Sequence, residues 1–279
     1  MANYTAADIK ALRERTGAGM LDVKKALDEA GGDADKALEI IRVKGLKGVA
    51  KREDRAASDG LVAAQVSDDA SGQTGVLIEL NSETDFVAKS PNFIELAQTV
   101  LDAAVASGTD DVAQVLASTH DGSTVQETID GTAATLGEKI VLRRVARLSA
   151  EKVTVYLHKV NKDLPPQVGV LVGTDAAGES VAKDIAMHVA AFAPKHVTRD
   201  EVPAETVEAE RRVAEETARN EGKPEAALPK IVEGRLTGFF KESVLLDQAF
   251  AKDTKKSVGQ VLTEAGGTVT GFARFRVGA

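Results

Sequence analysis

The sequence contains no cysteine and no tryptophan, and aromatic residues make up only 4% of its 279 residues. The absence of cysteine excludes disulfides and thiolate chemistry, which fits a reducing cytoplasm. No uninterrupted apolar run reaches the roughly 18 residues of a membrane span, and the N-terminus has no basic segment followed by an apolar one. We therefore expect a cytoplasmic protein that neither spans a membrane nor carries a standard export signal.

Positive charge is also in the minority. Lys and Arg number 35 against 43 Asp and Glu, which gives a formal net charge of −8. Proteins that bind nucleic acid present basic surfaces to the phosphate backbone, so this balance argues against direct nucleic-acid binding. Hydrophobic residues make up 43% of the chain and charged residues 28%, as in ordinary globular proteins. A chain of this length predicts two or three domains.

The common signatures of nucleotide-binding and hydrolytic enzymes are absent from the sequence. It has no Gly-x-x-x-x-Gly-Lys-Ser/Thr loop for nucleotide phosphates and no Gly-x-Ser-x-Gly elbow for a nucleophilic serine. Of the four histidines, His188 and His196 lack the spacing and neighbouring Glu of a zinc-binding helix, and His188 is predicted to be hydrogen-bonded and half-buried. We expect no cofactor, metal or small-molecule ligand, and a hydrolase is the disfavoured enzyme alternative.

The segment most typical of a functional loop is NSETDFVAK at residues 81–89. It follows an apolar strand at residues 75–80 and precedes a helix that begins near Pro91, so Asp85 and Phe86 should be presented rigidly at the exit of a strand. An aromatic ring beside a carboxylate on a polar loop indicates that the loop has a partner. A phenylalanine folded back into the core is an equally consistent interpretation of the same residues.

Three short helices are predicted in the first part of the chain. Thr5 and Asp8 form a capping box for the first helix, and Asp33 caps the third. Residues 45–59 are rich in Lys, Arg and Ala, which predicts a charged linker or a helical connector that leaves this bundle at a variable distance from the rest. We assign residues 1–55 to an N-terminal helical domain and its linker.

From residue 60 the apolar pattern alternates as in strands. Strands are predicted at residues 61–66, 75–80 and 140–148, and again at 153–158, 168–173 and 268–277, with apolar helices between them. The predicted fold class is α+β: a three-helix bundle, then two related α+β subdomains with small antiparallel sheets, residues 56–150 and 151–279. The alternating arginines of the 140–148 strand are expected to face water.

Residues 203–240 interrupt the second subdomain with a highly charged pattern. Its apolar stripe is thin, which is typical of an antiparallel, coiled-coil-like helical hairpin that stands off the body. Pro229 would cost about 3 kcal/mol inside a helix, so the second helix of the hairpin is predicted to begin there.

Three segments, far apart and in a fixed order, give the sequence a family resemblance. They are LRERTGAGM at residues 12–20, TDFV at 84–87 and IAMHVAA at 185–191. Together they resemble the signature segments of bacterial elongation factor Ts, the guanine-nucleotide exchange factor of elongation factor Tu. The resemblance implies that the N-terminal bundle is a ubiquitin-associated-like (UBA-like) domain and that the hairpin makes further contacts. It also implies that the C-terminal helical module of some members is missing, because the chain stops after the last predicted strand.

The resemblance implies a protein partner, elongation factor Tu, and a set of contact residues. The residues implied to act near the magnesium site of that GTPase, and so to promote release of Mg²⁺ and GDP, are Thr84, Asp85, Phe86 and Val87. Those implied to hold the partner elsewhere are Arg13, Met20, Leu21, Leu136 and His158, with Leu136 standing where the family usually has isoleucine.

The residues by themselves leave other interpretations open. Met20 is more often a core filler, Arg13 is equally a solvated helix charge, and His158 is equally a surface histidine without a role. A passive interaction scaffold or chaperone-like binder, indifferent to nucleotide, is the alternative function. Such a protein would bind its partner equally well in every nucleotide state.

Overall fold

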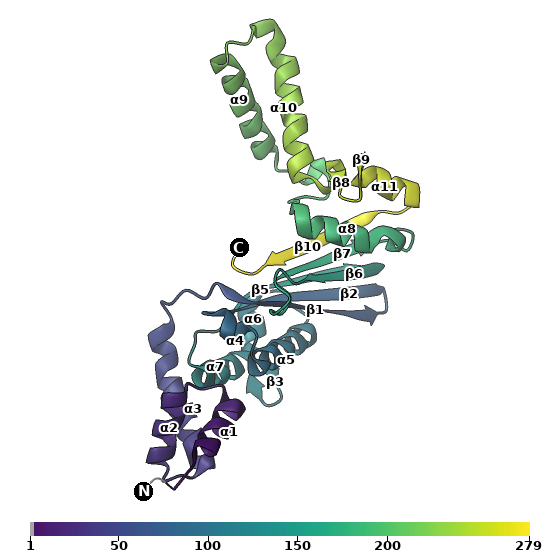
Figure 1. Cartoon of the computed structure of the whole chain (residues 1–279). Coiled ribbons are helices and arrows are strands. Elements are labelled where there is room, and N and C mark those ends of the chain that lie inside the picture. The colour runs from purple at the N-terminus through teal and green to yellow at the C-terminus, as the bar shows by residue number, and fades with distance from the viewer. Residues whose placement is uncertain (1–2) are drawn as a thin grey trace.

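The computed structural model describes residues 3–279, and its elements follow one another along an elongated molecule (Figure 1). The N-terminal helices lie at one end and a helical hairpin at the other. Between them, two sheets are stacked, with helices on the outer side of each (Figure 1). In these residues no helix has both the length and the apolar character needed to cross a membrane.

The N-terminal end is a three-helix bundle, as predicted. Its helices are α1 (Ala6–Thr16), α2 (Met20–Glu29) and α3 (Ala34–Val49). Thr5 and Asp8 form the predicted capping box, and Gly17 ends α1 with φ of 74°, a backbone conformation that glycine adopts without strain. Leu12, Val23 and Leu27 are among the apolar residues buried between the helices.

The prediction of a connector that leaves the bundle at a variable distance is wrong. The α3 helix continues to Val49 and is followed by a 3₁₀ turn, Ala50–Arg52, so the first part of the connector is helical, as one of the two predicted alternatives has it. Here α3 packs against α7 (Val125–Leu136), and a β-carbon on Gly45 would lie 2.1 Å from the carbonyl oxygen of Ala134. Because the two backbones meet this closely, the bundle is docked on the following subdomain.

The first subdomain contains a three-stranded antiparallel sheet with the order β1-β2-β5. Its strands are β1 (Asp59–Asp69), β2 (Gly72–Ser82) and β5 (Val141–Ala150). The segments that lie between β2 and β5 are α4 (Asp85–Ala88), α5 (Pro91–Ser107), α6 (Val112–Ala117), the short strands β3 (Thr119–His120) and β4 (Ser123–Thr124), and α7. Phe93 on α5 and Ile129 on α7 are fully buried in the core formed with the sheet.

The second subdomain repeats this plan, with the strand order β6-β7-β10. Its strands are β6 (Lys152–His158), β7 (Val168–Thr174) and β10 (Val269–Arg276), and the remaining elements are α8 (Glu179–Phe192), η2 (Arg199–Glu201), η4 (Leu245–Asp247), β8 (Ala249–Phe250), β9 (Asp253–Ser257) and α11 (Val258–Ala265). In both sheets the second strand is central and the third arrives after the helices. The predicted α+β class and the two related units are confirmed, whereas the exact limits 1–55, 56–150 and 151–279 stay predictions.

The two sheets pack face to face. Val62, Leu77, Val153 and Leu171, one from each of the strands β1, β2, β6 and β7, are buried together. A β-carbon on Gly169 would lie 2.6 Å from Leu77 Cδ1, so the absence of a side chain there permits the close approach.

The expectation that the arginines of the 140–148 strand face water is wrong for Arg144. Its Nε donates to a carboxylate oxygen of Glu79 at 2.7 Å, and its terminal nitrogen donates to the carbonyl of Arg276 at 2.9 Å. Glu79 is fully buried, and its carboxylate also accepts from Asn81 Nδ2 and from the backbone N–H of Gly278. Because β10 of the second subdomain lies beside β5, this side of the strand is covered rather than solvated.

The hairpin consists of α9 (Ala204–Asn220), the 3₁₀ turn η3 (Glu225–Ala227) and α10 (Leu228–Ser243). Pro229 lies in the first turn of α10, where a missing N–H costs nothing, and this confirms the predicted start of the second helix. The contact between the helices is narrow, with Ala214, Val232 and Leu236 buried.

Candidate partner-binding site

The predicted loop after β2 is a single helical turn. Thr84 caps α4, and its hydroxyl accepts from the backbone N–H of Val87 at 3.4 Å. Ala88 is fully buried and Val87 packs on the core of the first subdomain, so two side chains of the turn point inward. The turn is therefore anchored at both ends.

Phe86 points the other way. It is 74% exposed, which makes it the most exposed large apolar side chain among the described residues and rules out the core interpretation. Its neighbours in the turn are polar: Lys89 Nζ lies 4.4 Å from the centre of the Phe86 ring and 3.5 Å from a carboxylate oxygen of Asp85. At an exposed site such contacts contribute little, about 0.5–1 kcal/mol for the cation–π pair.

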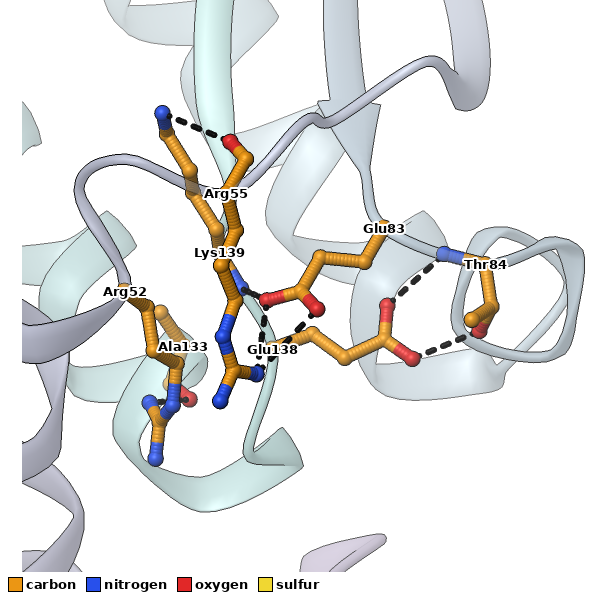
Figure 2. Close-up of polar contacts among 7 residues, drawn as sticks. All are labelled: Arg52, Arg55, Glu83, Thr84, Ala133, Glu138 and Lys139. Carbon is orange, nitrogen blue, oxygen red and sulfur yellow. Dashed lines mark hydrogen bonds and ion pairs between the residues drawn. The ribbon is translucent and has the colours of Figure 1, made fainter.

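Thr84 is held by hydrogen bonds with two other residues, and Figure 2 shows those to Glu138. The carboxylate of Glu138 accepts from the Thr84 backbone N–H at 3.0 Å and from the Thr84 hydroxyl at 2.5 Å. The Ser82 hydroxyl donates to the Thr84 carbonyl at 3.0 Å. The cap of the turn is thus held by charge-assisted hydrogen bonds, the stronger class in proteins.

Glu83, the residue before Thr84, accepts hydrogen bonds from Lys139, which follows Glu138, and from Arg55 (Figure 2). Its carboxylate accepts from the backbone N–H of Lys139 at 2.7 Å and from the guanidinium of Arg55 at 3.2 Å. The Lys139 ammonium donates to the carbonyls of Glu53 and Arg55. One polar network therefore joins the connector after the N-terminal bundle, the Phe86 turn and the segment that follows α7. None of these supporting side chains carries a local sequence signal, because a charged residue beside a loop is ordinary.

Leu136 and the loop between α1 and α2 are brought together. A β-carbon on Gly17 would lie 2.6 Å from Leu136 Cδ2, so the leucine packs directly on the glycine backbone. Beside this contact, Met20 is 58% exposed and Leu21 is 72% exposed, and Arg13 on α1 is also exposed. The core interpretation of Met20 is wrong. These side chains supply apolar contact surface next to the segment that supports Phe86.

His158 lies elsewhere, at the end of β6 in the second subdomain. It is exposed, and its Nδ1 is 3.1 Å from the hydroxyl of Tyr156, with the two rings stacked 6.0 Å apart. His188, by contrast, is buried: Nε2 pairs with Gln248 Oε1 at 2.8 Å, and Nδ1 accepts from the backbone N–H of Ala251 at 3.2 Å. Burial lowers the His188 pKa, and the Gln248 hydrogen bond opposes that shift in part. The predicted hydrogen-bonded role of His188 is confirmed, with complete rather than partial burial.

Within residues 3–279 no group of three or more His, Asp or Glu side chains is placed to hold a metal ion. The described residues do place an exposed aromatic turn on a rigid support, beside exposed apolar residues on a docked helical bundle. Such an arrangement is typical of the class of proteins that bind other proteins.

Comparison with known proteins identifies the family to which the chain belongs. The family model described as Elongation factor TS matches residues 83–279. Over 100% of both chains, the sequence is 70% identical to elongation factor Ts of Beutenbergia cavernae, 64% identical to that of Micrococcus luteus and 62% identical to that of Kocuria rhizophila. The chain belongs to the elongation factor Ts family, the non-catalytic nucleotide exchange factors of elongation factor Tu in translation elongation. This membership confirms the predicted function and partner.

Proposed function

We propose that the turn formed by residues 84–87 is the part of this exchange factor that acts on the nucleotide site of elongation factor Tu. The observation that carries the proposal is the 74% exposure of Phe86 on a turn whose cap is held by the Glu138 carboxylate. Phe86 inserts between helices of the GTPase near its magnesium site, and Asp85 orients the turn or perturbs groups beside it. Thr84 and Val87 anchor the turn on its own subdomain.

The mechanism is a linkage between two ligands of the GTPase. A factor that binds the nucleotide-free GTPase more tightly than the loaded one must weaken nucleotide binding by the same ratio. Insertion near the magnesium site disfavours the bound cation, and phosphates that lose their cation are held less tightly. No bond is made or broken in the nucleotide, so the turn needs no general acid, base or nucleophile.

The turn needs further contacts to account for exchange. Burial of one phenylalanine side chain contributes about 1.5–3 kcal/mol, which corresponds to one to two decades in affinity. We assign the remaining hold on the partner to exposed positions on two other surfaces. These are Arg13, Met20 and Leu21 with the adjoining Leu136, and His158 on the second subdomain.

The proposed partner contacts are distributed over the three predicted domains. Residues 1–55 supply the bundle with Met20, residues 56–150 the Phe86 turn, and residues 151–279 the surface around His158. The docking of α3 on α7 supports a fixed spacing between the first two surfaces.

The test is release of a fluorescent GDP from elongation factor Tu, followed with substoichiometric wild-type protein and with Phe86→Ala. Because Phe86 is exposed, the variant should unfold like the wild type, within about 0.5 kcal/mol, yet lose most of its exchange rate. Val43→Ala is the matched control, since Val43 is a 47% exposed apolar residue on α3 that belongs to none of the proposed contact surfaces.

Each result has a defined meaning. Loss of exchange in Phe86→Ala, with full activity in Val43→Ala, supports the proposed role of the turn. Full exchange in Phe86→Ala refutes that role. Binding that is equally tight in every nucleotide state, without acceleration, would identify a passive scaffold instead.

A further inference from the structure

We propose that Glu138 is a positioning residue for exchange: its carboxylate sets the direction in which the turn presents Phe86. The proposal rests on the proposed function of that turn. Glu138 does not reach the exposed ring itself; it acts through Thr84, to which it makes both a backbone and a side-chain hydrogen bond (Figure 2).

The turn cannot hold its own direction. It comprises four residues, and an isolated helix of that length does not persist in water because nucleation is unfavourable. Its only capping side chain is Thr84, whose contact with the Val87 N–H is long, at 3.4 Å. The strong contacts at the cap come from outside the turn, and the charged one is Glu138.

The segment that carries Glu138 also contacts the N-terminal bundle. Leu136, two residues earlier, packs on Gly17, and Lys139, one residue later, donates its backbone N–H to Glu83. Each glutamate thus accepts a hydrogen bond from the residue that follows the other one in the sequence. Glu138 accepts from Thr84, which follows Glu83, and Glu83 accepts from Lys139, which follows Glu138. One short segment therefore supports the turn and borders the loop of Met20, which fixes the spacing between the two proposed contact surfaces.

The second subdomain contains the same device with its parts exchanged. There the carboxylate of Asp175, directly after β7, accepts from the backbone N–H of Thr268 at 3.0 Å and from the Thr268 hydroxyl at 2.7 Å. Thr268 directly precedes β10, as Glu138 precedes β5. We call each pair a threonine–carboxylate clamp. Both clamps join the end of the central strand to the start of the outer strand.

Only the first clamp supports an exposed aromatic turn. Asp175 is followed by Ala176 and Ala177, which present no large side chain. The Asp175 clamp therefore has a purely structural task, and it serves as an internal control for Glu138. If Glu138 were only structural, loss of either clamp would have the same consequences.

The experiment measures kcat and KM for GDP release from elongation factor Tu, together with the thermal midpoint of each full-length variant. Glu138→Ala is expected to lower kcat about ten-fold, which corresponds to about 1.4 kcal/mol, with little change in KM because the other contacts remain. Asp175→Ala should lower the midpoint to a similar degree and leave exchange within two-fold of wild type. Glu138→Gln should restore most of the rate, because an amide can accept from the Thr84 N–H and donate to its hydroxyl.

A double variant locates the effect. If Glu138 acts through Phe86, adding Glu138→Ala to Phe86→Ala should lower exchange less than two-fold further. A full additional ten-fold loss in the double variant overturns the proposal, as do equal exchange losses in Glu138→Ala and Asp175→Ala. Full exchange in Phe86→Ala alone would refute the function of the turn and, with it, this inference, so the two failures are distinguishable.

Discussion

The close approach of α3 to α7 makes Gly45→Ala a sensitive probe of the docked N-terminal bundle. The added β-carbon would lie 2.1 Å from the Ala134 carbonyl oxygen and 2.5 Å from its carbon. Carbon contacts are favourable at about 3.5 Å, so the helices must separate by about 1 Å. Backbone atoms cannot relieve the clash by a change of rotamer, and overpacking of this kind typically costs about 1–3 kcal/mol. Alanine recovers up to about 1 kcal/mol of helix propensity, which leaves a net loss of up to about 2 kcal/mol where that gain is full.

Gly131→Ala, on the partner helix α7, is the matched control. Nothing lies within 4 Å of the β-carbon it would add, so only the helix propensity gain remains, up to about 1 kcal/mol. Thermal unfolding by circular dichroism should therefore shift in opposite directions for the two variants, downward by a few degrees for Gly45→Ala. In the same variant, trypsin should cleave faster at Arg55, whose carbonyl is bound by Lys139 in the docked state. An unchanged midpoint together with unchanged cleavage would refute the close docking of the two helices.

Two further outcomes are expected. Glu79→Ala should lower the free energy of unfolding by about 3 kcal/mol in urea titrations. The substitution leaves Arg144, at the subdomain interface, and the backbone N–H of Gly278 without the carboxylate that both of them bind. A loss below about 1 kcal/mol would contradict a structural role of Glu79. The lowered pKa of His188 sets the sign of the pH dependence of stability. Below about pH 6.5 the unfolded chain binds a proton at this histidine that the native state does not bind. The free energy of unfolding therefore falls as the pH drops, by at most about 1.4 kcal/mol per pH unit, until the native pKa is reached. His188→Gln should unfold with a shallower pH dependence between pH 7 and 5, and an equal slope in both proteins would contradict the assignment.

The local signals of the sequence predict most of the elements. The capping box at Thr5, the alternation of the strands and the start of α10 at Pro229 each depend on a few neighbouring residues, and each is observed. The repeat of the two subdomains also follows, because the two halves of the chain carry the same succession of patterns, whereas the strand order is known only from the structure.

The errors concern surfaces that only the folded chain creates. The sequence around Gly45 predicts a bundle at a variable distance from the rest because the contact with α7 is made by a glycine backbone, which leaves no apolar periodicity. The Arg144 side chain follows the pattern of a solvated strand face, yet β10, from the far end of the sequence, covers it.

The sequence likewise predicts one part of the candidate site and not the other. The Phe86 segment could be recognised from its letters, but its exposure could not, because a phenylalanine after a strand is equally compatible with a core position. The decision depends on Val87 and Ala88, which occupy the inward face of the turn and leave Phe86 outside. Glu138 could not have been singled out, because its partner Thr84 is 54 residues away along the chain.

The repeated clamp also separates the residues that close each sheet from those that lie beyond it. The two half-domains share one strand order and one closing device. Each sheet is closed at the same corner, so the residues beyond the corner can differ while the closing hydrogen bonds stay the same. In this chain the half-domain closed by Glu138 has an aromatic turn there and the half-domain closed by Asp175 has alanines. Phe86 can therefore change without loss of the clamp, whereas a change at Glu138 affects both the closure of its sheet and the turn beside it.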